Sequence, residues 1–201
     1  MSYYYFPATG EKNAKTEAQI KHHTRYYPKE LNDAIVIYLS KKYETNTKIP
    51  DGLNTDIVCT FREGATYNLQ EIIDPKAHLL LKIDNNKIVG LIQILGKKDT
   101  ESNNKSNITI DLVCSNVKGL GKELIDIIKK LVTELKISQI TLTLDNISLT
   151  SYYTGQGFTT SSEDETFMIW TPPKQNAGMR RKTANKRKRH IKKNKKYTYK
   201  T

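Results

Sequence analysis

Cysteine and tryptophan are scarce in this 201-residue chain, which has two cysteines and one tryptophan. Cys59 and Cys114 lie far apart in the sequence and match no metal-ligand spacing. The sequence therefore predicts neither a zinc site nor a disulfide framework, and we expect no metal cofactor. Two buried thiols in a reducing compartment are the expectation.

Long apolar runs are missing as well. Met1 to Pro7 lacks the basic and apolar regions of a signal peptide, and no later stretch approaches the roughly 20 apolar residues of a membrane span. We expect an intracellular protein, cytoplasmic or nuclear, with no membrane partner. The length suits one domain of about 150 to 180 residues with extensions.

Acidic residues are absent from residues 180–201, which carry 12 of the 33 Lys and Arg residues. The 21 other basic residues balance the 21 Asp and Glu residues, so the whole formal charge of +12 lies in this segment. With almost nothing apolar to bury, residues 174–201 are predicted to form a disordered polybasic tail. Nonspecific nucleic-acid binding or nuclear localisation is favoured over a merely solubilising tail.

The most specific pattern begins at Asn107. A β-like run through Val113 leads into a glycine turn, and a helix with one apolar face follows at once. Glycines let the backbone approach a phosphate, and the free N–H groups and dipole of a helix start attract anions. The candidate ligand-binding residues of this stretch are Val113, Asn116, Lys118, Gly119, Leu120, Gly121 and Lys122, with the phosphate expected at the glycine turn.

A second strand pattern, Gln139 to Leu144, follows the helix and leads into Asp145 to Phe158. This order resembles the GNAT superfamily of N-acetyltransferases. The family's loop begins with Gln or Arg, continues with any two residues, a Gly and any one residue, and ends with Gly or Ala. A later segment of the family has an Asn after a strand, a Tyr seven residues further on, and then a Gly-Phe pair. Asn146, Tyr153, Gly157 and Phe158 match the later marks, whereas Asn116 replaces the Gln or Arg.

The resemblance covers about residues 77–170 and implies an α/β (α+β) fold, with a central mixed, mostly antiparallel sheet flanked by helices. We place the acetyltransferase domain at 29–173 and a mobile N-terminal extension at 1–28. Periodicity predicts a helix at 29–43, helical turns at 68–73, and strands at 56–61, 77–83, 87–95, 158–161 and 165–171. Asp84 to Asn86 predicts a hairpin turn, and 96–107 a solvent loop.

The chemistry implied is direct attack of an amine on the thioester of acetyl-coenzyme A. In the family, the coenzyme's pantetheine arm lies in a splayed gap between the fourth and fifth strands. Tyr153 is the candidate proton donor to the leaving thiolate, and Asp111 the candidate general base, with Asn107, Glu63 or a water chain as alternatives. Lys118 or Lys122 would pair with the pyrophosphate, and Asn146 would orient pantetheine or cap a helix.

Two classes of function remain open. The first is an acetyltransferase that acts on a primary amine of a small molecule or of a protein, at a lysine or an N-terminus. The second is a noncatalytic protein with the GNAT fold, associated with nucleic acid or with a viral particle through its basic tail.

Overall fold

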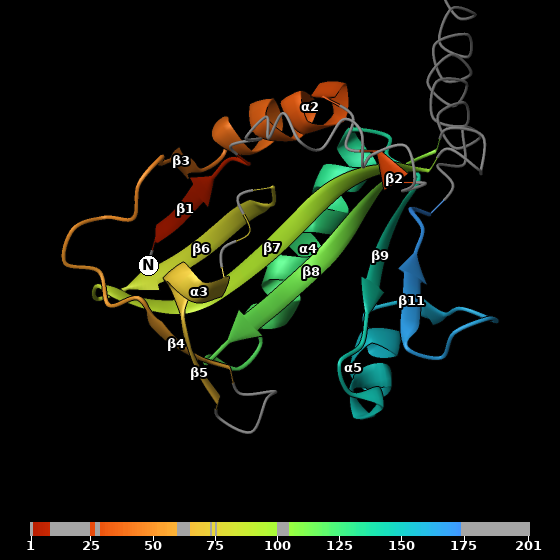
Figure 1. Cartoon of the computed structure of the whole chain (residues 1–201). Helices are drawn as coiled ribbons and strands as arrows, with labels where there is room; N and C mark the ends of the chain where they lie inside the picture. Colours follow the sequence, from red (N-terminus) through yellow and green to blue (C-terminus); the bar gives the residue numbers. More distant parts are fainter. Residues whose placement is uncertain are drawn as a thin grey trace, which may run out of the picture.

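One large sheet organises the computed structural model, which describes residues 2–8, 25–26, 29–59, 65–72, 74, 76–99 and 105–173 (Figure 1). The polybasic tail and Glu63 lie outside the described residues. The sheet has nine strands in the order β10-β11-β9-β8-β7-β6-β1-β3, and β2 pairs with β7. Its strands are β1 Ser2–Phe6, β2 Arg25–Tyr26, β3 Glu44–Thr45, β6 His78–Asp84, β7 Lys87–Asp99, β8 Ser106–Ser115, β9 Gln139–Thr143, β10 Thr159–Thr160 and β11 Phe167–Trp170.

The predicted fold class is confirmed. Among the described strands of this sheet, β8–β9 and β1–β3 are the parallel pairs, and the other neighbours are antiparallel. The β6–β7 hairpin turns at Asn85 and Asn86, whose positive φ angles of 49° and 58° suit a tight hairpin. β7 runs on to Asp99, so its end occupies part of the expected solvent loop.

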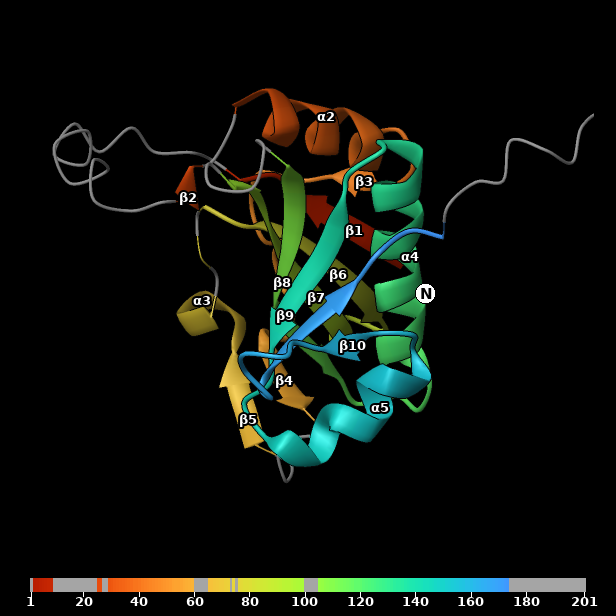
Figure 2. The same cartoon turned by 90° about the vertical axis from the view of Figure 1, so that its right-hand side faces the viewer.

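Two helices cover one face of the sheet, α2 (Lys29–Ser40) and α4 (Leu120–Glu134) (Figure 2). The apolar stripe of α4 is fully buried, because its residues recur at helical spacing toward the sheet. These residues pack with side chains of α2 and of the central strands: Leu124, Ile125, Ile128, Leu131, Ile35, Leu39, Ile92, Ile94, Ile108 and Ile110. We call this the helix face.

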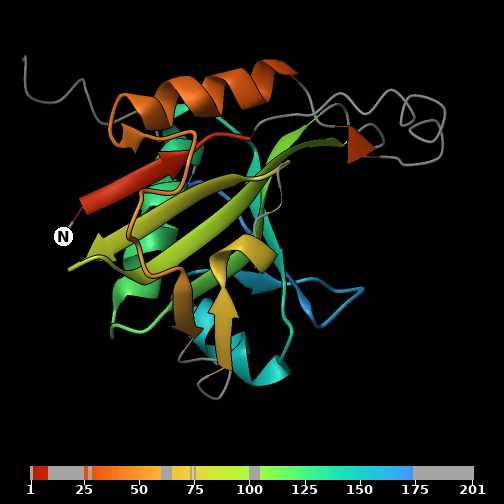
Figure 3. The same ribbon diagram turned by 60° about the vertical axis from the view of Figure 1, so that its left-hand side comes forward.

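A small hairpin covers part of the opposite face. β4 (Asp56–Cys59) pairs with β5 (Ala65–Asn68), and α3 (Leu69–Ile72) follows (Figure 3). Ile57 and Leu69 pack there against Leu79, Leu81 and Leu91 of the sheet. We call this the hairpin face. Because both faces of the central strands are covered, those strands are nearly continuously apolar.

Residues 2–6 correct the expectation of an N-terminal extension. They form β1, which pairs antiparallel with β6, and Tyr5 is fully buried. The aromatic run from Tyr3 to Phe6 pairs with the edge of β6 and thus extends the apolar sheet. The predicted helix at 29–43 also ends earlier, at Ser40.

The prediction of two thiols was wrong, because Cys59 and Cys114 form a disulfide. They are 55 residues apart in sequence, but β4 folds back across β8 and leaves their Cα atoms 5.0 Å apart. Spacing in the sequence carries no information on this crossing. The argument for a reducing compartment therefore loses the support of free thiols.

Candidate active site

The sheet opens between β8 and β9. The two strands pair in parallel from Asn107–Gln139 to Ile110–Leu142, and their pairing ends there, although β8 continues to Ser115 (Figure 1). A strand edge without a partner offers backbone N–H and C=O groups to an extended ligand. The resemblance implied such a gap, and the structure has it.

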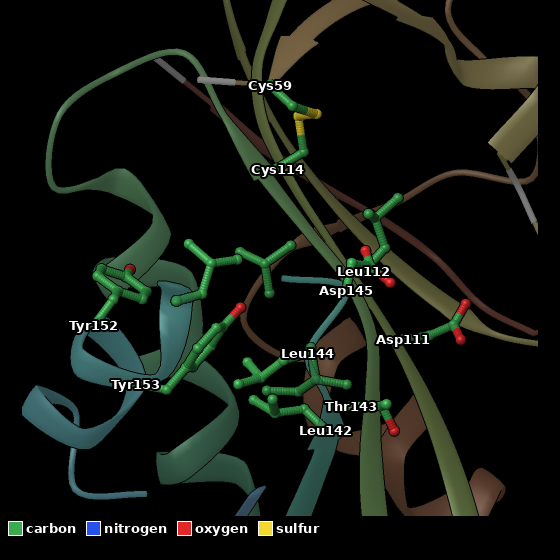
Figure 4. Close-up of a pocket in the computed structure, with 13 residues that line it drawn as sticks. Cys59, Asp111, Leu112, Cys114, Leu142, Thr143, Leu144, Asp145, Tyr152 and Tyr153 are labelled. Atoms are coloured by element: carbon green, nitrogen blue, oxygen red, sulfur yellow. A yellow bond between two sulfur atoms is a disulfide. The ribbon is translucent and has the colours of Figure 1, made fainter. Parts of the chain in front are cut away.

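A cavity of about 60 Å³ fills the opening (Figure 4). Its wall includes residues of the helix face, such as Ile110 and Leu142, and of the hairpin face, such as Cys59 and Cys114. The cavity thus lies between the two faces of the sheet. Its lining residues are Cys59, Ile110, Asp111, Leu112, Val113, Cys114, Leu142, Thr143, Leu144, Asp145, Leu149, Tyr152 and Tyr153.

Tyr153 lies on α5 (Thr150–Gly155), and its hydroxyl points into the opening (Figure 4). Its ring is fixed edge-on against Phe158, with centroids 5.7 Å apart, and against Tyr152, at 5.1 Å. Burial, and secondarily the neighbouring Tyr152, raises the pKa of Tyr153 to about 12. The hydroxyl therefore stays protonated at neutral pH and can donate a hydrogen bond into the cavity.

The glycine turn lies where α4 begins. Gly119, the residue before the helix, has a φ of 85°, a conformation that glycine adopts without strain. Gly121 is buried in the first helical turn; a Cβ atom there would lie 3.0 Å from the Tyr152 hydroxyl and 3.9 Å from Val113 Cγ1. Leu120 is buried beneath this turn. Tyr152 therefore lies between the start of α4 and the cavity.

Lys118 and Lys122, the two predicted cations at the glycine turn, differ in whether they already have an ion-pair partner. Lys118 is exposed at the turn, whereas Lys122 is ion-paired with Asp126 at 2.5 Å. The Asn116 backbone N–H donates to the Val89 carbonyl at 3.1 Å, and its side chain is exposed. The ion pair between Lys122 and Asp126 is exposed and stabilises the fold little, so Lys122 can exchange Asp126 for a phosphate.

Asn146 has a structural task instead of a place in the cavity wall. Its side chain accepts a hydrogen bond from the Ser148 backbone N–H at 2.9 Å and caps the 3₁₀ turn η3 (Ile147–Leu149). The helix-cap alternative is therefore the one that the structure shows. Asn107 lies where β8 and β9 are still paired and does not line the cavity.

Asp111 lines the cavity and is exposed. The β7–β8 register passes from Ile94–Ile110 to Gln93–Leu112, so Asp111 is an extra residue in β8 with no counterpart on β7. Such a β-bulge redirects a side chain. Gln93 Nε2 donates to Asp111 Oδ2 at 3.2 Å.

Sequence reasoning missed Tyr152, Thr143 and Gln93 as parts of this region. Tyr152 stands beside the predicted tyrosine, and a pattern match does not decide which of two adjacent rings enters a cavity. Gln93 carries a signal that was available, because it is a polar residue inside the apolar run Ile88 to Leu95.

Two further features bear on the class of site. Among the residues that the structure describes, no group of three or more His, Cys, Asp or Glu side chains is placed to hold a metal ion. In the same part of the chain, no helix combines the length and the apolar character needed to cross a bilayer.

Known proteins give limited similarity. No protein-family model and no curated protein sequence matches the chain. A solved structure of a KacTA–DNA complex is 11% identical over 52% of this chain and 73% of the other, with a TM-score of 0.45. A mutant AtaT toxin bound to the C-terminus of the antitoxin AtaR and to acetyl-CoA is 12% identical over 48% and 67%, with a TM-score of 0.40.

Arabidopsis thaliana Naa50, in complex with a bisubstrate analogue, is 16% identical over 45% of this chain and 69% of its own, with a TM-score of 0.37. Similarity this low concerns the fold at most. The chain has a mixed sheet flanked by helices and opened between β8 and β9, the arrangement that the resemblance to GNAT acetyltransferases implies. Activity and acceptor are inferred from its own residues.

Proposed function

We propose that this protein is an N-acetyltransferase that transfers an acetyl group from acetyl-coenzyme A to a primary amine. The observation that carries the proposal is the opening between β8 and β9, with the Tyr153 hydroxyl directed into it and a glycine turn at the start of α4 beside it. A narrow cavity and an unpaired strand edge suit a thin, extended arm with amide groups.

Each part of the site has a task. The first turn of α4 offers backbone N–H groups to the pyrophosphate, with Lys118 as an exposed cation nearby. The free edge of β8 near Val113 offers hydrogen bonds to the pantetheine amides. The apolar residues Leu142, Leu144 and Leu149 exclude water from the reacting thioester.

The reaction requires three proton transfers within the site, and the proton that Asp111 takes then passes to solvent. Asp111 takes one proton from the incoming ammonium, which frees the nitrogen lone pair. The nitrogen attacks the carbonyl carbon, the N–C bond forms, and the C–S bond breaks. Tyr153 donates its proton to the departing sulfur and regains one from the acetylated nitrogen, so the tyrosine ends unchanged.

Calorimetric titration of the full chain with acetyl-coenzyme A tests the proposal. Gly121→Val is the informative variant, because Gly121 has an ordinary helical φ and the added side chain would meet the Tyr152 hydroxyl rather than backbone. We expect acetyl-coenzyme A affinity to fall at least about tenfold. Gly155→Val is the matched control, since a Cβ there meets nothing within 4 Å.

Three outcomes decide between the two classes of function. Binding with thiol release in the presence of an amine supports the transferase. Binding without turnover of any amine supports the noncatalytic alternative. Equal affinity of the wild type and a folded Gly121→Val variant would remove the glycine turn from the site.

A further inference from the structure

Lys129 is a largely buried cation where α4 contacts α5. Its side chain is 15% exposed, and its ammonium donates a hydrogen bond to the carbonyl of Gln156, the residue that follows α5. The same nitrogen lies 5.4 Å from the centre of the Phe158 ring and 5.5 Å from that of Trp170, distances typical of attraction between a cation and an aromatic face. Phe158 in turn is the ring against which Tyr153 is fixed. Lys129 therefore holds the end of α5 and the rings beside it.

Packing alone does not explain a charge at this position. Burial lowers the pKa of Lys129, because an ammonium in apolar surroundings loses its water. An uncharged side chain of similar length would fill the same space without that cost. The contact with α5 accounts for the charge: none of the six residues of this helix is fully buried, so apolar packing fixes it only in part.

The position of α5 decides where the Tyr153 hydroxyl points. Two contacts hold this helix beside the start of α4 (Figure 2): the Tyr152 hydroxyl lies near Gly121, and the Gln156 carbonyl accepts from Lys129. Gly121 and Lys129 are about two turns of α4 apart. The Lys129 contact is thus the fixed point at the far end of the helix that carries Tyr153.

Asp126 connects Lys129 to the glycine turn. Its Oδ2 is paired with Lys122 Nζ at 2.5 Å, and its Oδ1 lies 3.9 Å from Lys129 Nζ. Spacings of four and three residues place these three side chains along one side of α4. A phosphate that takes Lys122 leaves Asp126 with Lys129 as the other cation of this row, so the attraction between Asp126 and Lys129 strengthens.

We propose that Lys129 is the positioning residue for Tyr153, and that Asp126 couples phosphate binding at Lys122 to that position. The inference rests on the proposed transferase function and adds how the coenzyme orders the same site. Without a phosphate, Asp126 is shared between two lysines. With a phosphate on Lys122, Asp126 turns to Lys129 and fixes its ammonium at the end of α5. The Tyr153 hydroxyl is then held in the opening while the coenzyme is in place.

Trp170 gives a direct readout, because it is the only tryptophan of the chain and its ring lies 5.5 Å from the Lys129 ammonium. Titration of the full chain with acetyl-coenzyme A should shift the fluorescence of Trp170, since indole emission responds to the movement of a nearby charge. Inorganic pyrophosphate should produce part of the same shift. In Lys129→Met, which keeps the length of the side chain and removes its charge, the shift should disappear.

Steady-state kinetics with an amine that supports thiol release test the positioning role. Lys129→Met should lower kcat about tenfold and leave KM for acetyl-coenzyme A within about twofold. Lys129→Arg should recover most of kcat, because a guanidinium also donates to a carbonyl and lies over aromatic rings. Lys130→Met is the matched control, since Lys130 is exposed on the same helix, and it should keep wild-type values in both assays.

Asp126→Asn separates the coupling from stability. The change removes the rival of the phosphate for Lys122, so acetyl-coenzyme A affinity should rise, by at most about fivefold, while kcat falls. A variant that merely loosened the fold would lose affinity instead. The Asp126 side chain is 39% exposed, so this variant tests the inference even where Lys129→Met fails to fold.

The results separate the two proposals. Wild-type kcat or an unchanged Trp170 shift in folded Lys129→Met overturns this inference and leaves the transferase function standing, and wild-type kcat in Asp126→Asn does the same. If acetyl-coenzyme A does not bind at all, the proposed function fails first and this inference fails with it. Binding that shifts Trp170 only when Lys129 is present, without turnover of any amine, removes the transferase and keeps the coupling.

Discussion

At the residue scale, two adjacent tyrosines have different places. Tyr153 directs its hydroxyl into the opening between β8 and β9, whereas the Tyr152 hydroxyl lies near Gly121 at the start of α4 (Figure 4). The difference arises because successive residues of a helix point about 100° apart. One hydroxyl therefore faces the cavity, and the other lies at the start of α4.

Replacement of Tyr153 by Phe should lower turnover by about 100-fold to 10,000-fold, the usual effect of losing an acid catalyst. The ring contacts with Phe158 and Tyr152 remain, so folding and acetyl-coenzyme A affinity should stay close to wild type. Steady-state kinetics with thiol detection, together with calorimetry, checks this. Full activity of the Phe variant would reassign Tyr153 to packing.

His78 is a second residue whose surroundings make a measurable prediction. Its Nδ1 accepts from the Ala8 backbone N–H at 3.3 Å and from the Tyr5 hydroxyl at 2.7 Å, so the ring proton lies on Nε2, 3.2 Å from Asn32 Oδ1. Burial lowers the pKa of His78 from 6.5 to about 4. The native ring therefore stays neutral where the unfolded chain already takes up a proton.

The sign of the effect follows from that difference. Below pH 6.5 the unfolded chain gains a proton on His78 that the native protein does not take up until about pH 4. This proton uptake favours unfolding, so the free energy of unfolding should drop by about 2 kcal/mol between pH 7 and pH 5. Urea titrations at the two pH values measure it. His78→Gln, which does not titrate in this range, should show a correspondingly smaller drop. An equal drop in both proteins would contradict the assignment.

At the scale of elements, the β4–β5 hairpin forms part of the wall of the cavity between β8 and β9. Cys59 of β4 and Cys114 of β8 both line the cavity, and their disulfide ties the hairpin to the open strand. Ile57 adds an apolar contact with the sheet. The hairpin is thus fixed at the end of β8 that borders the cavity.

Loss of this disulfide should destabilise the protein by about 2 to 4 kcal/mol, because the bond closes a long loop in the unfolded chain. We expect reductant, or the double change Cys59→Ala and Cys114→Ala, to lower Tm by roughly 5 to 15 °C. Thermal melts with and without reductant measure it, and the double variant should not respond to reductant. An unchanged wild-type Tm under reductant would contradict the bond's contribution.

At the scale of the whole molecule, charge is divided along the chain. Residues 1–179 are neutral in formal charge, and residues 180–201 carry the entire +12. A neutral body followed by a polybasic segment favours attachment to a polyanion through that segment and not through the cavity. We keep nucleic-acid association and nuclear localisation as proposals about this segment.

Removal of residues 180–201 should abolish association with DNA or RNA and leave acetyl-coenzyme A affinity intact. Binding by the full chain should weaken with salt at a log-log slope of about −0.9 for each duplex phosphate neutralised, with little sequence preference. Titrations at several salt concentrations measure this. Nucleic-acid binding by the truncated protein, or a full chain indifferent to salt, would leave the tail as a solubilising extension.

The sequence by itself determined the local elements of the domain. Hydrophobic periodicity placed α4 and β6 to β9, and the Asp84 to Asn86 turn placed the β6–β7 hairpin, since these depend on neighbours within a few residues. The glycine turn and Tyr153 were found because a motif of fixed spacing lies within one continuous segment. β1 was missed because a short aromatic run becomes a strand only when β6 offers it an edge.

Tertiary structure alone decided which distant residues meet. The crossing of β4 over β8 joined Cys59 to Cys114, and the register shift between β7 and β8 put Asp111 beside Gln93. The end of pairing at Ile110–Leu142 opened the cavity into which Tyr153 points. Strand pairing and bulges are set by packing between segments far apart in the chain, and no pattern within one segment encodes that packing.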